Sequence, residues 1–387
     1  MSEFLVLGAG KMGSVLARAL LDREPGHRVT LVDRDPAQLE RAAALASGDR
    51  VASLRVDLRD GPACQEAFRA KDVAIAALPH AYSIMALEMA VRCGVHFVDL
   101  VGEDPAARQV HDARATQRGI TLLSGIGVAP GISNACVGRA VGLLDQTDTA
   151  VIYVGGNPMR PEPPLNYKVV FAIESVLDAY DRTVSILENG RLVQVSPLSG
   201  LEPIGFAPPY DEMECFYTDG LHSLLHTMQG RVTGLLAEKT VRYKGHADGI
   251  ETLKACGLFS QQPLRIDGQE VVPRRLLAHV LESRMQLGEE GDVTLLRVVV
   301  KGRKQGKPET HVFEMVDHFD PEKRVTSMAR TTAFPAAITA QMITAGTISQ
   351  RGSVFPETVF AGDLFDPLMA ALREYGVVVS HRVIPGG

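Results

Sequence analysis

The stretch FLVLGAGKMGSVLARALLD (residues 4–22) decides the fold of the N-terminal part of the chain. Four apolar residues predict a buried strand, the pattern G-x-G-x-x-G follows at once, and an amphipathic run then predicts a helix. Gly8 allows the tight turn, Gly10 lets a phosphate approach the backbone, and Gly13 lets helix and strand pack closely. The stretch therefore predicts a dinucleotide site, with the pyrophosphate at the helix N-terminus.

An acidic residue at the expected spacing supports this interpretation. Asp33 ends the next apolar run and follows Gly13 by 20 residues, where a carboxylate can bind the ribose hydroxyls of a dinucleotide. Because a carboxylate repels the 2′-phosphate of NADP, we expect NAD to be preferred, although Arg34 offers that phosphate a partner. Lys11 and Met12 complete the expected phosphate turn. An ordinary turn between strand and helix is the alternative.

Six short apolar runs alternate with helix-like stretches in the first part of the chain; they cover residues 4–7, 29–32, 51–56, 73–78, 96–100 and 120–124. Strands that are apolar on both faces are typical of a parallel sheet between two helical layers. We predict an α/β fold with a Rossmann-type, doubly wound parallel sheet in a dinucleotide-binding domain of residues 1–125. Asp57 could border the adenine or be a solvated surface residue. Leu78 and Pro79 would border the nicotinamide ribose, because ligands bind at the carboxyl ends of such strands.

The pattern changes after about residue 145. Asn189-Gly190 and Asp267-Gly268 are hairpin signals, because both central residues of a type I′ turn need positive φ, and residues 293–316 resemble a third hairpin. We expect residues 126–329 to form an α+β substrate and dimerisation domain with a mixed or antiparallel sheet. The C-terminal segment 330–387 is expected to return to the first domain.

Composition excludes several classes of protein. The chain has 387 residues, 45% of them hydrophobic, and a net charge of -6. An acidic chain lacks the basic surface that binds nucleic acid, and no apolar run approaches the ~20 residues that cross a membrane. Five scattered cysteines without C-x-x-C spacing and the absence of a signal sequence favour the cytoplasm. We expect a homodimer or homotetramer that binds a small-molecule amino acid.

Three groups of polar residues are candidates for chemistry. Asp99 ends the fifth apolar run, where its carboxylate could hold an ammonium group or could cap a helix. Arg242 and His246 share one face of an expected strand, where they could bind a carboxylate or form a solvated basic surface. His222 and His226 have a spacing that can bind zinc, but no third ligand stands out, so we expect no metal site.

The chain resembles the saccharopine dehydrogenase-like family and, within it, the lysine 6-dehydrogenases. The resemblance covers essentially the whole chain and rests on these motifs: VLGAGKMG (6–13), GVHFVDL (94–100), GVAPGISN (127–134), YVGGNPMRPEPPLNYK (153–168), TVRYKGH (240–246) and MARTTAF (328–334). The proline-rich segment 157–165, which otherwise predicts a rigid connection outside any central strand, becomes an expected active-site loop.

The resemblance implies an NAD-linked oxidative deamination of the ε-amine of L-lysine, which yields allysine, cyclising to a piperideine carboxylate, and ammonia. It implies that Asp99 holds the ε-ammonium group and that Tyr167 and Lys168 are acid or base groups at the reacting carbon. Arg242 would bind the α-carboxylate, with His246 and Arg330 in support. A saccharopine dehydrogenase, which acts on a secondary amine of lysine, is the alternative in the same family. A more distant alternative is a redox sensor that binds NAD without catalysing a reaction.

Overall fold

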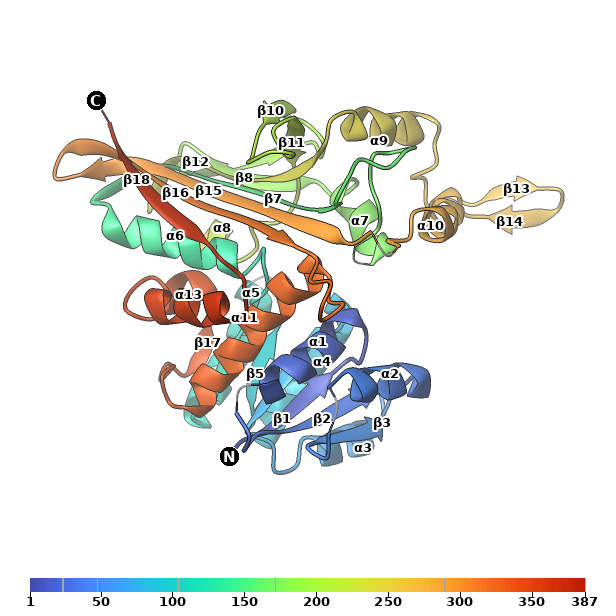
Figure 1. Ribbon diagram of the computed structural model, residues 1–387, viewed down its shortest axis with the longest axis vertical. Coiled ribbons are helices and arrows are strands. Elements are labelled where there is room, and N and C mark those ends of the chain that lie inside the picture. The colour runs from blue at the N-terminus through green and yellow to red at the C-terminus, as the bar shows by residue number, and fades with distance from the viewer. Residues whose placement is uncertain (23, 47, 103–104, 171, 289, 387) are drawn as a thin grey trace.

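Two large sheets lie one above the other, and a third sheet has only two strands (Figure 1). The computed structural model describes every residue except 23, 47, 103–104, 171, 289 and 387. One sheet is parallel with strand order β17-β6-β5-β4-β1-β2-β3, and the other is mixed with the path β10-β11-β12-β7-β15-β16-β18. The predicted fold class, a Rossmann-type sheet with a second mixed sheet, is confirmed.

The parallel sheet is built from alternating strands and helices. They are β1 (Glu3–Leu7), α1 (Lys11–Asp22), β2 (Arg28–Asp33), α2 (Pro36–Ala46), β3 (Val51–Arg55), α3 (Gly61–Ala67), β4 (Val73–Ala76), α4 (His80–Cys93), β5 (His96–Asp99), α5 (Pro105–Gln117) and β6 (Thr121–Leu123). The strand order reverses direction between β1 and β4, and such a switch point opens a crevice at the carboxyl ends of the strands.

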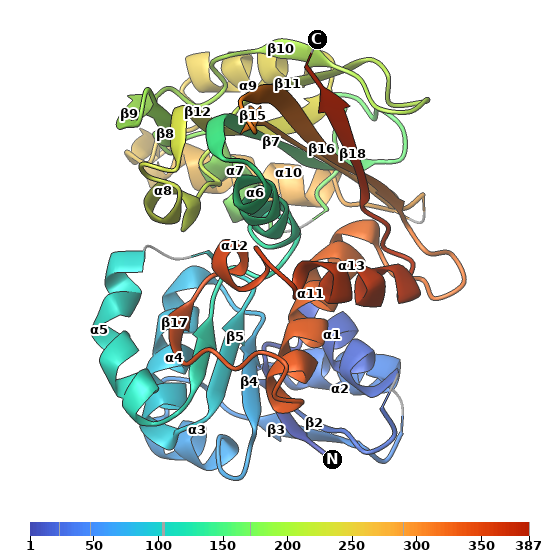
Figure 2. The ribbon, with the colours of Figure 1, turned by 90° about the vertical axis from the view of Figure 1, so that its left-hand side faces the viewer.

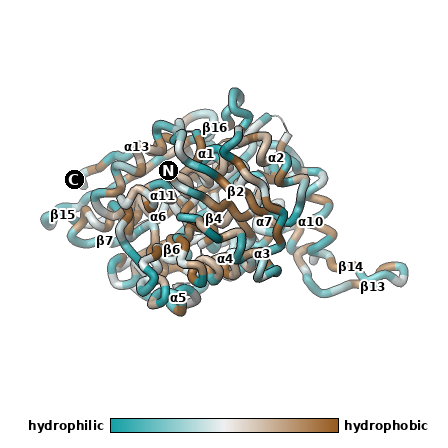
Figure 3. Tube along the Cα trace, turned by 90° about the horizontal axis from the view of Figure 1, so that it is seen from below, coloured by the Kyte–Doolittle hydropathy of each residue, from teal (hydrophilic) through white to brown (hydrophobic). Residues whose placement is uncertain are grey.

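Both faces of the parallel sheet are covered, which explains why its strands are apolar on both sides. Phe4 and Val6 of β1 face the core that contains α1 and α2, whereas Leu5 and Leu7 face the core beneath α3 and α4. In Figure 3 brown segments of the parallel sheet lie among helices in which teal and brown residues are mixed. Burial on two sides thus decides the strand composition.

The second region follows the parallel sheet along the chain. Its elements are α6 (Ile132–Leu143), β7 (Gln146–Pro158), α7 (Ile173–Ala179), β8 (Val184–Glu188), β9 (Arg191–Val195), β10 (Glu202–Ile204), β11 (Met213–Tyr217), α8 (Leu224–Thr227), β12 (Val232–Tyr243), α9 (His246–Ala255), β13 (Leu264–Ile266), β14 (Gln269–Val271), α10 (Pro273–Arg284), β15 (Asp292–Lys304) and β16 (Lys307–His318). Most neighbouring strands are antiparallel, but β7 and β12 are parallel.

The three predicted hairpins are confirmed. Asn189-Gly190 joins β8 to β9, and Asp267-Gly268 joins β13 to β14, with positive φ at all four residues. The third hairpin pairs β15 with β16. The β13–β14 hairpin projects away from the body of the protein (Figure 1).

The C-terminal segment is divided between the two sheets. It contains α11 (Ser327–Thr344), β17 (Gly352–Val354), α12 (Pro356–Val359), α13 (Phe365–Glu374) and β18 (Ser380–Pro385). Strand β17 extends the parallel sheet beside β6, but β18 pairs with β16 of the mixed sheet. The expectation that the whole segment joins the first domain therefore does not describe β18. Figure 2 shows α11 and α13 between the two sheets.

One local expectation was wrong. The proline-rich segment was expected to lie outside any central strand, yet β7 continues through Asn157 to Pro158 in the middle of the mixed sheet. Pro158 is the last residue of the strand, where its missing N–H interrupts no further pairing. Only the part after Pro158 can therefore act as a loop.

Candidate active site

The glycine turn between β1 and α1 has the shape that a pyrophosphate needs. Gly8 has φ +93°, and a Cβ at Gly13 would overlap the carbonyl oxygen of Gly8, so neither position accommodates a side chain. A Cβ at Gly10 would meet nothing within 4 Å. The turn is therefore tightly packed at Gly8 and Gly13 and open at Gly10, which lies next to the N-terminus of α1. These residues fit a dinucleotide.

Asp33 stabilises this turn as well as bordering it. Its Oδ2 accepts a hydrogen bond from the backbone N–H of Ala9 at 2.8 Å, and its Oδ1 accepts one from that of Asp35 at 2.9 Å. The next residue, Arg34, is exposed. Asp57, which was expected to border the adenine, pairs with Arg59 at 2.9 Å, and this arginine holds the pKa of Asp57 below its usual range.

The residues after β4 complete the crevice. A Cβ at Gly8 would lie 2.5 Å from the carbonyl oxygen of Ala77 and 3.2 Å from Cδ2 of Leu78. Pro79 precedes α4 directly. The structure thus brings the expected cofactor residues of β1, β2 and β4 to one edge of the sheet.

Asp99 does not have the environment that was expected for a group that binds an ammonium ion. It is fully buried and forms an ion pair with Arg108 of α5. Its two oxygens also accept hydrogen bonds from Ser83 at 3.0 Å and from the N–H of Gly125 at 3.0 Å. Because protein donors already neutralise this carboxylate, we correct its role to a positioning residue at the end of β5.

Arg242 lies in a buried cluster of aromatic and polar side chains. Its Nε donates to the Tyr180 hydroxyl at 3.0 Å, and its guanidinium lies over the Tyr167 ring, 4.7 Å from the centroid. His246 contacts the same Tyr180 hydroxyl through Nε2 at 2.9 Å, and its Nδ1 lies 2.8 Å from the carbonyl oxygen of Leu165. Burial, with the nearby charge of Arg242, lowers the pKa of His246 to about 3, so this ring is neutral.

Two atoms of this region point to a bound molecule. The buried hydroxyl of Tyr167 has no hydrogen-bond partner among the described residues. Nη1 of Arg242 donates to two backbone carbonyls. Its Nη2 forms no hydrogen bond with any described residue. Lys168 is half-buried. A carboxylate could accept from Nη2, the arrangement expected of Arg242 as a binding residue.

Arg330 lies elsewhere, which corrects the expectation that it supports the substrate. It begins the second turn of α11 and pairs with Asp317 at 3.3 Å and with Asp320 at 3.4 Å. Its Nη2 also donates to the carbonyl oxygen of Tyr375. These contacts fasten α11 to the end of β16 and leave Arg330 a structural role.

The sequence did not predict one residue of the site, Tyr180, and it indicated His222 without showing its contacts. Tyr180, which joins Arg242 to His246, follows α7 in a segment without a recognisable motif. His222 has φ +45°, and its ring occupies the space where a Cβ on Gly102 would lie. Burial lowers the pKa of His222, and the charges of Asp219, His80 and Arg182 act on the same ring. The loop between β11 and α8 therefore reaches the residues after β5 through His222.

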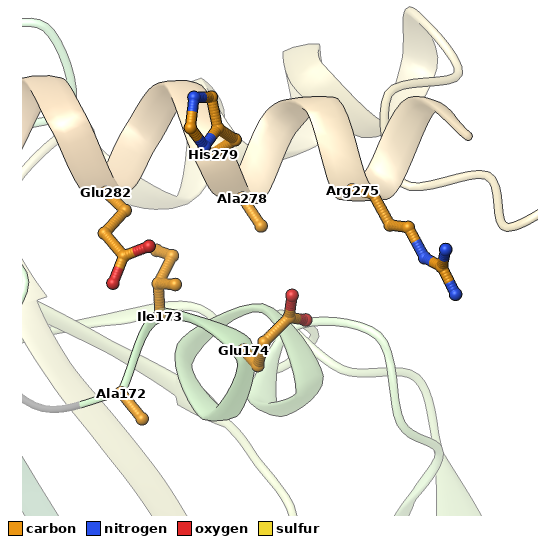
Figure 4. Close-up of a pocket in the computed structure, with 7 residues that line it drawn as sticks. All are labelled: Ala172, Ile173, Glu174, Arg275, Ala278, His279 and Glu282. Carbon is orange, nitrogen blue, oxygen red and sulfur yellow. The ribbon is translucent and has the colours of Figure 1, made fainter. Parts of the chain in front are cut away.

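The cavity between α7 and α10 is a different feature (Figure 4). It has a volume of about 380 Å³, and its polar lining residues are Glu174, Arg275, His279 and Glu282. None of the expected site residues lines it, so we place the candidate site at the crevice instead.

The part of the chain that the structure describes contains neither a metal-binding cluster nor a membrane-spanning helix. No group of three His, Cys, Asp or Glu residues there could hold a metal ion. None of the helices described is both long and apolar enough to pass through a membrane.

Two alanine substitutions should separate the roles of the glycines. Gly10→Ala should fold with an unchanged melting temperature and bind NADH and NADPH at least about tenfold more weakly, because its methyl group enters the pyrophosphate space. Gly13→Ala should lose about 1–3 kcal/mol of stability, because its methyl group overlaps the Gly8 backbone. Thermal unfolding and fluorescence titration measure these effects. Unchanged dinucleotide binding by Gly10→Ala would refute the assignment.

A second pair of substitutions tests the role of Asp99. Asp99→Asn should cost about 3–5 kcal/mol in urea unfolding, because it removes the buried carboxylate that pairs with Arg108. Asp57→Asn, the matched control, removes an exposed ion pair and should change stability little. Equal losses in the two variants would contradict the positioning role.

Models of protein families match nearly the whole chain. Residues 4–123 match the saccharopine dehydrogenase NADP binding domain, and residues 127–377 match the saccharopine dehydrogenase C-terminal domain. The two matches divide the chain close to the end of β6.

Individual relatives are similar over their full length. The chain is 24% identical to the saccharopine dehydrogenase [NADP(+), L-glutamate-forming] of Pyricularia oryzae, over 98% of each protein. It is 23% identical to the carboxyaminopropylagmatine dehydrogenase of Synechocystis, over 100% of this chain and 98% of that protein.

A solved structure shares the fold. The apo saccharopine dehydrogenase (L-Glu forming) from Saccharomyces cerevisiae superposes with a TM-score of 0.83 at 21% identity, over 99% of this chain and 100% of that one. The relatives named here are not lysine 6-dehydrogenases, so the comparisons support the wider resemblance and not the narrower one. With the glycine crevice and both family matches in place, the chain belongs to the saccharopine dehydrogenase family of oxidoreductases.

Proposed function

We propose that the protein is a nicotinamide-dependent dehydrogenase that oxidises the secondary amine of a saccharopine-type amino acid, or forms that amine in the reverse direction. The observation that supports this most is Arg242, a buried guanidinium with an unused Nη2 on the sheet that faces the cofactor crevice. The names of the relatives in Pyricularia and Saccharomyces agree with it. Our first expectation, L-lysine as substrate, becomes the second candidate.

The reaction requires a proton and a hydride to leave the substrate. A bound dinucleotide accepts the hydride from the carbon attached to nitrogen. The amine nitrogen must first be deprotonated, since a lysine-type amine with a pKa of ~10.4 carries a positive charge at neutral pH. Water then adds to the C=N bond, and cleavage of the C–N bond yields an aldehyde and a free amine.

The residues of this chain bind the substrate and move the protons. Arg242 would hold a carboxylate through Nη2, with Tyr180 and the neutral His246 fixing its orientation. Burial raises the pKa of Tyr167, so its hydroxyl would donate a hydrogen bond rather than act as a base. Lys168, whose ammonium makes no hydrogen bond or ion pair with the described residues, is the candidate for proton transfer.

The primary ε-amine of L-lysine is the second candidate substrate. It is favoured by two acidic residues, Asp219 of the loop before α8 and Glu238 of β12. Acidic side chains suit a cationic amine better than they suit the additional carboxylates of saccharopine. Both candidates place the reacting nitrogen at the cofactor crevice.

We also propose that NADP is used at least as well as NAD, which replaces our expectation that NAD is preferred. Both oxygens of Asp33 already accept backbone N–H groups, which lowers their capacity to bind ribose hydroxyls. The exposed guanidinium of Arg34 forms no ion pair among the described residues, so it is available to a 2′-phosphate. The family model for this domain is described as NADP binding.

The substrate is tested by following the reduced dinucleotide that forms from saccharopine or L-lysine. Saccharopine should give the higher kcat/KM. Arg242→Lys should lower this value at least about tenfold, because one ammonium group cannot keep the contact with Tyr180 and also donate to a carboxylate from the position of Nη2. Arg191→Lys, which changes an exposed arginine of β9, serves as the control. Turnover of neither amine by the wild type would overturn the proposed function, and faster turnover of L-lysine would favour the second candidate.

The cofactor preference is tested with Arg34→Ala. This variant should bind NADPH about tenfold or more weakly, the loss expected for one charge-assisted contact, and should bind NADH as the wild type does. Isothermal titration calorimetry with both dinucleotides measures the difference. A wild type that binds NADH more tightly than NADPH would refute NADP as the favoured cofactor.

A further inference from the structure

Glu238 is a buried carboxyl group, and one of its oxygens accepts no hydrogen bond from the described residues. It lies on β12, is only 6% exposed, and its Oε2 has no hydrogen-bond partner among the described residues. Burial, reinforced by the charge of Asp219, raises the pKa of Glu238 to about 8. Leaving such a group unpaired is unfavourable, and an entering cation would relieve this cost.

The loop before α8 holds the carboxyl group in place. A Cβ on Gly220 would overlap Oε1 of Glu238, so the carboxyl group lies directly against the backbone of this loop. The loop is fastened to β12 by a hydrogen bond of 2.8 Å between the hydroxyls of Thr218 and Thr240. Asp219 therefore stays beside Glu238.

Strand β12 also sets the distance between the acidic end of the site, at Glu238, and its basic end, at Arg242. Glu238, Thr240 and Arg242 alternate along β12 and so share one face of the sheet. The four-residue step from Glu238 to Arg242 spans about 13 Å of strand. A molecule with a carboxylate at Arg242 can thus present a group several bonds away to Glu238.

The acidic end borders the cofactor crevice. Asp219 and His222 belong to the same loop, and the His222 ring fills the space beside Gly102, three residues after the end of β5. The charges of Asp219 and Asp99 both act on that ring. Parallel strands present their ligands at this edge, so the acidic end lies on the side where hydride transfer takes place.

We propose that Glu238, assisted by Asp219, binds the amine nitrogen of the substrate and selects molecules that carry a cationic nitrogen remote from the carboxylate on Arg242. This assignment rests on the proposed function and gives the recognition role once expected of Asp99 to Glu238. The ligand class is an elongated amino acid with a basic primary or secondary amine. One relative is named carboxyaminopropylagmatine dehydrogenase, and the compound in this name carries both a carboxyl and an aminopropyl group.

Equilibrium binding by calorimetry, with the dinucleotide present, tests the proposal. The probes are saccharopine, L-lysine and L-norleucine, which resembles lysine but lacks the ε-amine. Glu238→Gln keeps the shape of the side chain and removes its ability to ionise, so its binding of saccharopine and L-lysine should weaken about tenfold or more. Its affinities for L-norleucine and for NADPH should change less than about twofold.

Two further variants complete the experiment. Gly220→Ala should displace the carboxyl group and weaken the binding of both amines similarly, whereas Glu188→Gln at the exposed end of β8 should bind them as the wild type does. Thermal unfolding verifies that each variant is folded. Wild-type affinity of folded Glu238→Gln for both amines, or no binding of either by the wild type, would overturn the assignment. Amine binding that depends on Glu238 without any turnover would uphold it and refute only the proposed function.

Discussion

Three separate segments of the chain meet at the carboxylate of Asp99. Ser83 of α4, Arg108 of α5 and the backbone at Gly125 all donate to it, and none of this arrangement is exposed to solvent. A buried charge separated from its partners is costly, so these segments cannot move independently. The edge of the parallel sheet is thereby rigid where the cofactor crevice and the path into the second region both begin.

The mixed sheet contributes the specificity of the site, because one of its strands carries charges of opposite sign on one face. Arg242 is surrounded by aromatic rings and hydroxyls, whereas Glu238 is enclosed by a glycine loop. Helix α11 packs against both sheets and α6 packs against the mixed sheet, which fixes the position of one sheet relative to the other (Figure 2). The result is a site assembled from two domains, which suits an elongated, bifunctional substrate.

Local features explain which predictions succeeded. The glycine turn, the strands of the parallel sheet and the three hairpins depend on φ preferences and on the spacing of apolar residues, which neighbouring residues determine. The choice of cofactor was harder, because Asp33 has the expected position but uses both oxygens on its own backbone. Spacing alone does not show how many donors a carboxylate already has.

The sequence by itself determined the family resemblance, the two kinds of sheet and the cofactor turn, since these follow from patterns within short stretches. Only the tertiary structure decided which polar residues are free to bind a ligand. Asp99 and Arg330 were expected at the substrate but form ion pairs with Arg108 and with Asp317, whereas Glu238 and Arg242 form no ion pair with any described residue. The physical reason is that the partner of a buried charge comes from a distant part of the chain, and its identity depends on how the two sheets pack together.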